Sequence, residues 1–143
     1  MPAGPSVQDM VANAAFLFGL VESLASDSRE PSVQFAEVRD NFYLAARHGL
    51  NARLVWRGEH VLASSLILRH LLPQAGEGLR HLDVDRHDME HYLGIIEQRV
   101  ESRQTGSEWQ RAFIARNAGD FSAMTKKYLD HQQSGQPVHA WPF

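Results

Sequence analysis

The chain has 143 residues, the length of one ordinary domain, and 43% of them are apolar, which is average for a globular protein and too high for a disordered one. Its net charge of −3 and pI near 6.2 give no general attraction to nucleic acid or to an acidic membrane surface. The lack of cysteine excludes disulfides, a thiol nucleophile and a thiolate metal site. Since no apolar leader follows Met1, we expect a cytoplasmic protein that binds neither nucleic acid nor membrane.

The first predicted element is a helix over about 7–25. Ser6 and Asp9 have the spacing of a capping box, in which side chains satisfy the free N–H groups at a helix start. The apolar side chains of this segment spread round most of the circumference, which is typical of a helix surrounded by protein. We therefore expect it to be covered by the rest of the chain or by a partner. Residues 26–32 are polar, include Pro31 and predict a linker.

The next stretch predicts an amphipathic helix followed by a short hairpin. Apolar side chains recur at helical spacing from Phe35 to Ala46, and Gly49 stands where a left-handed C-terminal cap is expected. Residues 52–56 and 60–62, separated by a turn, predict the two strands. This is the one region where the sequence favours β-structure.

A third helix is predicted over 62–72. Pro73 is expected to end it, because proline lacks the N–H that a helix interior requires. Gly76 and Gly78 then indicate a turn.

The most regular periodicity follows this turn. Asp85 and Asp88 mark the start of a fourth helix. Its apolar residues recur at the spacing of one buried face: Met89, Tyr92, Leu93, Ile96 and Val100.

Two more helices are predicted towards the C-terminal end. Thr105 and Glu108 form another capping box, and Gly119 ends the helix that they start. Asp120 starts the last helix, which Gly135 ends.

The tail over 138–143 contains Trp141 and Phe143, and we expect both rings to pack back on the helices. The elements together predict an all-α fold, a bundle of five to six helices with at most one short β-hairpin. Residues 1–143 are expected to form a single helical domain.

One short motif has the spacing of a metal site. His87, Glu90 and His91 fit the H-x-x-E-H pattern of inverted zincins, in which two histidines bind zinc and the glutamate is the base. A third ligand would have to come from a nearby glutamate: Glu97, Glu101 or Glu108. This pattern gives the hypothesis of a small zinc hydrolase. The interpretation that we favour is that these polar residues form the solvent side of the fourth helix.

A basic face is predicted on the second helix. Arg39, Tyr43 and Arg47 lie at i, i+4 and i+8, so two guanidiniums flank a phenol and can bind a phosphate or carboxylate bidentately. Such a stripe is also typical of the solvent side of an amphipathic helix. The sequence has no nucleophile elbow and no glycine-rich phosphate loop, so these residues alone name no reaction.

Five longer strings carry a family resemblance. They are GPSVQDMVANAAF (4–16), DNFYLAARHGLNA (40–52), YLGIIEQRV (92–100), QTG continuing to WQR (104–111) and PVHAW (137–141). In this order, and over nearly the whole chain, they resemble the C-terminal third of bacterial carboxylate-amine ligases of the glutamate-cysteine ligase type.

The resemblance implies an enzyme that couples ATP hydrolysis to amide-bond formation through an acyl phosphate. In the family, magnesium is held by carboxylates on an antiparallel sheet that precedes this region. We expect that sheet, and with it the ligands of ATP and magnesium, to be absent from this chain. The isolated chain is then expected to be inactive and to need a catalytic domain or chain, or to self-associate.

The resemblance also assigns candidate site residues. Asn41 and Arg47 match the family's Asn and Ala-Ala-Arg-x-Gly-Leu positions, and with Arg39 they are expected to face the substrate or nucleotide cleft. The acid and amine substrates stay unassigned. Two alternatives remain: a non-catalytic helical interaction or dimerisation module, and the small zinc hydrolase that would use His87, Glu90 and His91.

Overall fold

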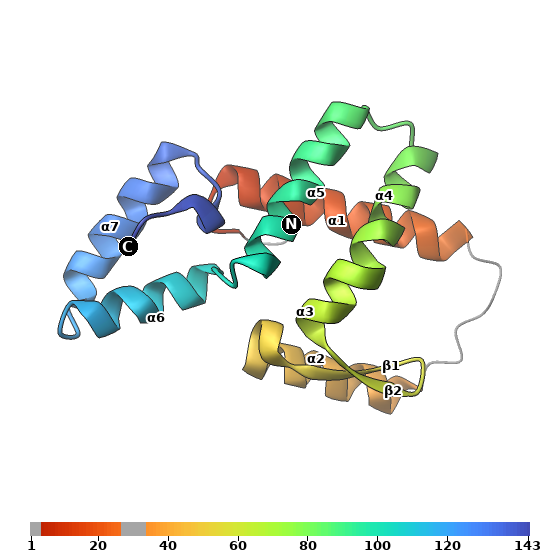
Figure 1. Ribbon diagram of the computed structural model, residues 1–143, viewed down its shortest axis with the longest axis horizontal. Helices are drawn as coiled ribbons and strands as arrows, with labels where there is room; N and C mark the ends of the chain where they lie inside the picture. Colours follow the sequence, from red (N-terminus) through yellow and green to blue (C-terminus); the bar gives the residue numbers. More distant parts are fainter. Residues whose placement is uncertain (1–3, 27–33) are drawn as a thin grey trace.

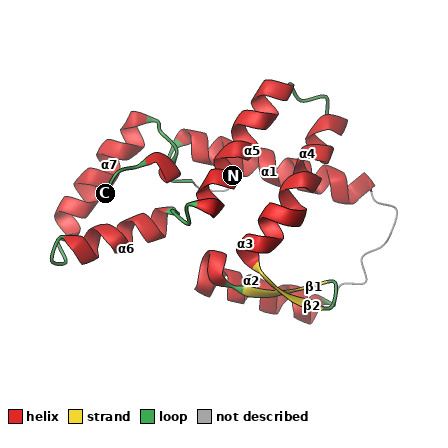
Figure 2. Ribbon diagram, in the orientation of Figure 1, coloured by secondary structure: helices red, strands yellow, loops and turns green. Residues whose placement is uncertain are grey.

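The computed structural model describes residues 4–26 and 34–143. The elements are α1 (Val7–Ser26), α2 (Phe35–His48), η1 (Gly49–Asn51), β1 (Arg53–Trp56), β2 (Glu59–Leu62), α3 (Ala63–Leu66), η2 (Ile67–Leu71), α4 (Leu72–His81), α5 (Arg86–Glu101), α6 (Gly106–Arg116), α7 (Phe121–Ser134) and η3 (Val138–Ala140). Because α3, η2 and α4 follow one another without a break, the described residues form six main helices and one two-stranded antiparallel sheet (Figures 1 and 2). The predicted all-α fold with one short hairpin is confirmed. The predicted linker lies outside the described residues, except for Ser26, which ends α1.

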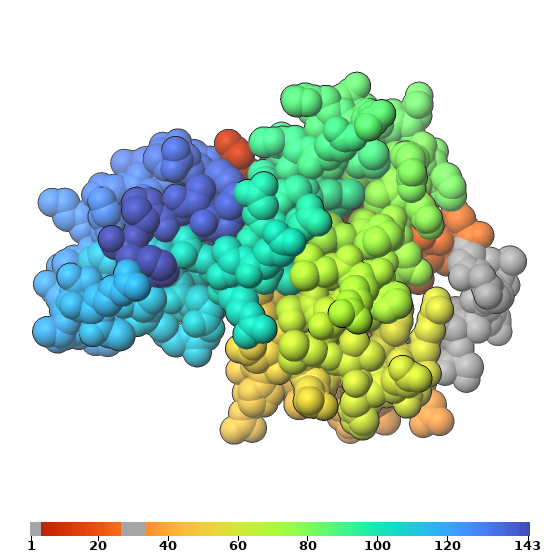
Figure 3. Space-filling model, in the orientation of Figure 1, coloured from red at the N-terminus to blue at the C-terminus, as the bar shows by residue number. Residues whose placement is uncertain are grey.

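The core has two parts. α1 crosses α4 and α5 in the middle of the molecule, while α6 and α7 lie together at one end (Figure 1). The space-filling view shows this end, in blue, as a lobe beside the rest (Figure 3). The central cluster consists of Ala12, Leu72, Ile95, Ile96 and Val100. The cluster in the α6–α7 lobe consists of Trp109, Val138 and Trp141.

Local capping signals place most helix starts where the sequence predicts them. At α1 the predicted capping box is present: the N–H of Asp9 donates to Ser6 Oγ at 3.2 Å, and the N–H of Ser6 donates to Asp9 Oδ2 at 3.1 Å. Asp85 caps α5 by accepting from the N–H groups of His87 and Asp88 in its first turn. Asp120 caps α7 in the same way.

The second predicted capping box is only half formed. Thr105 Oγ1 accepts from the N–H of Glu108 at 3.3 Å, as expected for the start of α6. The Glu108 carboxylate pairs with Arg111 one turn later, instead of returning to the backbone of Thr105. The guanidinium attracts this carboxylate more strongly than a neutral N–H group does.

The prediction that Pro73 ends the third helix is wrong. The helix continues through Pro73 into α4, after a π-helical turn at η2. A proline leaves the carbonyl four residues earlier without its N–H partner, and a wider turn with i to i+5 bonding accommodates this gap.

The predicted turn at Gly76 and Gly78 is also wrong, since both glycines lie inside α4. Gly78 packs against α1, whereas a Cβ on Gly76 would meet only the side chain of Leu93 on α5, at 3.6 Å. A Cβ on Gly78 would lie 1.9 Å from the carbonyl oxygen of Gly19, and a Cβ on Gly19 would lie 2.3 Å from that of Ala75. The two backbones therefore cross at a distance that no larger residue permits.

The C-terminal tail packs back only in part as predicted. Trp141 is 2% exposed, and its indole N–H donates to the carbonyl of Gln136 at 2.7 Å. Phe143 stays about half exposed, with the guanidinium of Arg116 4.3 Å from its ring centre. A cation over an aromatic ring stabilises such an exposed arrangement modestly.

The expectation that α1 is surrounded is met on one face only. Ala12 and Gly19 are buried against α4 and α5, but Phe18 and Val21 on the other side are 62% and 56% exposed.

By length and composition α1 also meets the criteria for a membrane-spanning helix. One such helix is weak evidence, because core helices and signal sequences meet the same criteria.

Candidate functional site

A depression lies where the end of α2 meets the junction between α5 and α6. Its volume is about 210 Å³. It is lined by Ala46, Arg47, His48, Gly49, Leu50, Asn51, Arg103, Thr105, Ser107, Glu108 and Arg111. Two segments more than fifty residues apart thus form one small polar concavity, which we name the arginine depression.

The three guanidiniums of the arginine depression differ in their hydrogen-bond and ion-pair partners. Arg103 Nη1 donates to Asn51 Oδ1 at 3.3 Å, and Arg111 forms an ion pair with Glu108. Arg47 has no partner among the described residues. One of the predicted site residues therefore offers a free charge to this concavity.

The other two predicted site residues lie elsewhere on α2. Arg39 is on the surface and forms an ion pair with Asp40 at 2.9 Å. The amide of Asn41 donates to the carbonyl of Val55 at 2.7 Å and accepts from the N–H of Val55 at 2.8 Å. Asn41 thus holds α2 against the free edge of β1, a structural role that its family resemblance did not indicate. That the three residues share one cleft stays a prediction.

The candidate zinc motif lies on the outer surface of α5. His87, Glu90 and His91 are exposed, and Glu90 pairs with Arg86 at 2.6 Å. Across residues 4–26 and 34–143, no group of three His, Asp or Glu side chains gathers in a way that could hold a metal ion. The geometry gives the zinc-hydrolase alternative no support.

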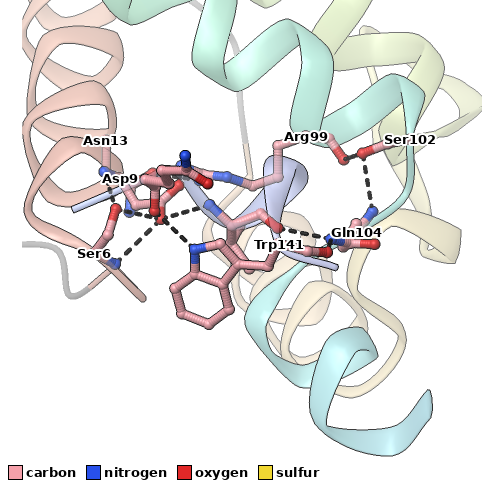
Figure 4. A network of polar contacts seen from close by, with 9 residues as sticks. Ser6, Asp9, Asn13, Arg99, Ser102, Gln104 and Trp141 are labelled. Atoms are coloured by element: carbon pink, nitrogen blue, oxygen red, sulfur yellow. Dashed lines mark hydrogen bonds and ion pairs between the residues drawn. The ribbon is translucent and has the colours of Figure 1, made fainter. Parts of the chain in front are cut away.

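A buried charge network, which sequence reasoning missed, joins the two ends of the fold (Figure 4). Asp9 is fully buried; its Oδ1 accepts from Arg99 at 2.7 Å and its Oδ2 accepts from the N–H of Val138 at 3.0 Å. Arg99 also donates to Asn13 Oδ1 at 2.7 Å. The capping-box motif indicated only the contact between Asp9 and Ser6. No local signal points to a partner 129 residues away.

The network continues into the tail through Gln104. Its side-chain N–H group donates to the carbonyls of Val138 and Trp141, both at 2.8 Å. Burial lowers the pKa of His139, which lies near Asp9 and Arg99, so this imidazole favours its neutral form. Asp9, Arg99 and Gln104 are used in holding η3 and the tail on the helices, and we assign these three side chains a structural role.

Comparison of the chain with models of known families, with curated proteins and with solved structures finds no match in any of the three. The fold and the depression therefore define the chain as an all-α protein with a small basic concavity. Its relation to the ligases stays a prediction.

Proposed function

We propose that this chain is the C-terminal helical part of an ATP-dependent carboxylate-amine ligase of the glutamate-cysteine ligase type, and that it acts against a catalytic domain or chain. The observation that supports this proposal is the outward apolar face of α2. Phe35, Val38 and Phe42 are 81%, 51% and 70% exposed, and α2 has no buried residue.

The apolar side of α2 faces away from the rest of the described chain, whereas the apolar side of an amphipathic helix usually faces the core. Its contacts with the described residues are made mainly to β1 and η1 and include the amide of Asn41, while its apolar stripe points away. Burying a Phe or Val side chain stabilises a protein by about 1.5–3 kcal/mol, so three of them left in water represent a substantial free energy that a partner would recover. Contiguous exposed apolar side chains commonly mark interaction sites.

In this proposal the two parts of the enzyme have different tasks. The catalytic part supplies the ligands of ATP and magnesium, since the described residues hold no group of carboxylates that could bind a metal. The helical part supplies the apolar face of α2 and directs Arg47 towards the substrate or nucleotide cleft. The isolated chain is inactive because positioning and charge neutralisation by the metal dominate phosphoryl transfer.

The test is purification of the chain from its native cells, followed by identification of any stoichiometric partner and an assay for ATP-dependent amide formation. We expect a partner with an antiparallel ATP-binding sheet, and activity only in the complex. Phe42→Ser should release the partner and abolish the activity. Phe121→Ser is the matched control, because Phe121 is similarly exposed, at 64%, but lies on α7.

Two results would contradict the proposal. One is isolated chain that hydrolyses ATP and joins an amino acid to a carboxylic acid unaided. The other is a native chain that purifies as a free monomer.

A dimerisation module is the second candidate, and α1 favours it. Exposed apolar residues on α1 follow the alternating spacing of four and three that packs helices into coiled coils: Val7, Val11, Phe18 and Val21, with Ala14 between them. A stable homodimer that has no catalytic partner and no affinity for nucleotide would favour this function over the ligase.

A further inference from the structure

The arginine depression carries a local charge opposite to that of the whole chain. Arg47, Arg103 and Arg111 line it with one carboxylate, Glu108, whereas the formal charge of the complete sequence is −3. Three guanidiniums on one small concavity repel one another unless an anion lies between them. The single carboxylate present is already engaged with Arg111.

The backbone at Arg103 is a second, independent indication. Arg103 has φ of 55°, and its N–H bonds the carbonyl of Val100, so it occupies the left-handed position that follows the end of α5. Glycine is the usual residue there, because a side chain in this conformation costs free energy. An arginine at this position faces the depression and is held by Asn51 at the price of backbone strain. Strained residues of this kind cluster at binding sites.

We propose that the arginine depression binds the phosphate group of a small molecule. A tetrahedral dianion accepts hydrogen bonds in several directions at once and so suits guanidiniums that arrive from two separate segments, whereas one arginine suffices to bind a carboxylate bidentately. The hydroxyls of Thr105 and Ser107 add polar groups to the same lining. The volume of about 210 Å³ admits one such group.

The proposal deepens the function proposed above, because it gives the ligand class that Arg47 would contact. It is nevertheless tested on the isolated chain, without a catalytic partner and without amide formation. Failure of one proposal is thus distinguishable from failure of the other.

The experiment is a titration of ¹⁵N-labelled protein with inorganic phosphate and, separately, with AMP, read from the backbone amides of Gly49 and Ser107. We expect saturable shifts at both amides. Tighter binding of AMP than of phosphate assigns the group to a nucleotide, and equal binding assigns it to free phosphate. Either result supports a phosphate site.

Four variants give the test its controls. Arg47→Ala should weaken binding about tenfold, the usual effect of removing one charge-assisted hydrogen bond. Arg103→Gly should weaken it similarly while the thermal midpoint stays equal or rises, which a merely structural arginine would not produce. Glu108→Gln should tighten binding, because it removes the competing carboxylate. Arg80→Ala, on the exposed side of α4, should change nothing.

The proposal is overturned if phosphate and AMP both give shifts that do not saturate. It is equally overturned if Arg47→Ala and Arg103→Gly bind phosphate as tightly as Arg80→Ala does.

Discussion

Gly19 and Gly78 meet where α1 crosses α4, so closely that a methyl group on Gly78 would lie 1.9 Å from the carbonyl oxygen of Gly19. The atom in the way is backbone and cannot rotate aside. The crossing of these two helices, which bury Ala12, Ala75 and Leu79, therefore depends on the absence of a side chain at two positions.

Gly78→Ala should destabilise the fold by about 2 kcal/mol or more, because overpacking forces the helices apart. Urea denaturation followed by circular dichroism measures the loss. The matched control is Gly94→Ala on α5, where an added Cβ meets nothing within 4 Å. There the better helix propensity of alanine should raise the unfolding free energy by about 0.5–1 kcal/mol. Equal effects of the two substitutions would contradict the close crossing.

Asp9→Ala should cost about 3–5 kcal/mol, since it leaves the guanidinium of Arg99, which is only 14% exposed, without its carboxylate. The control is Asp40→Ala, which removes a surface ion pair with Arg39 and should cost less than about 1 kcal/mol. Chemical denaturation of both variants gives the comparison. If Asp9→Ala is as mild as Asp40→Ala, the network does not stabilise the fold.

Asn41→Ala should loosen α2 from the hairpin, because the backbone N–H and carbonyl of Val55 both lose their partner. We expect a loss of about 1–3 kcal/mol and faster hydrogen exchange at the Val55 amide. Arg39→Ala, two residues away, serves as the control and should leave that exchange rate unchanged. Slow exchange at Val55 in both variants would show that another group holds the strand.

The pH dependence of stability should reflect His131. Its side chain is 9% exposed and stacks on Trp141, and burial, followed by the charge of Lys127, lowers its pKa from the ordinary 6.5, while Asp130 and the carbonyl of Pro142 oppose the shift. The unfolded chain therefore binds more protons below about pH 6.5, so the unfolding free energy should fall as the pH drops through that range.

His131→Phe keeps an aromatic ring beside Trp141 but removes the titrating group. Thermal denaturation between about pH 7.5 and about pH 5.5 should then show a shallower decline than in the unsubstituted chain. Burial also lowers the pKa of His139, so part of the decline should remain. Parallel profiles for the two proteins would exclude His131 as a contributor.

Local signals in the sequence were sufficient for most of the helices. The caps at Ser6, Asp85 and Asp120 depend on side chains within three residues of the helix start, and they lie where the pattern predicts them. The hairpin follows from an equally short-range pattern. On α5 the pattern predicts buried Ile96 and Val100 correctly, but Met89, Tyr92 and Leu93 are only partly buried, and Ile95 is buried without having been predicted. Such features are readable because the interactions that cause them are close in sequence.

Long-range contacts account for what the sequence could not predict. Pro73 and Gly78 indicate a helix end when each is considered alone, but packing of α4 on α1 outweighs these local preferences. The arginine depression combines Arg47 with Arg103 and Arg111, and the pattern on α2 revealed only the first of them.

The bond from the backbone N–H of Val138 to Asp9 also fixes an order of events during synthesis. Until Val138 has left the ribosome, the carboxylate of Asp9 lacks its most distant partner. Its negative charge has no cationic partner until Arg99 has also emerged. Loop closure over 129 residues is entropically costly, so docking of the tail belongs among the last steps of folding. A nascent chain stalled before that point would lack Val138 and Trp141, the two residues that complete the buried cluster around Trp109.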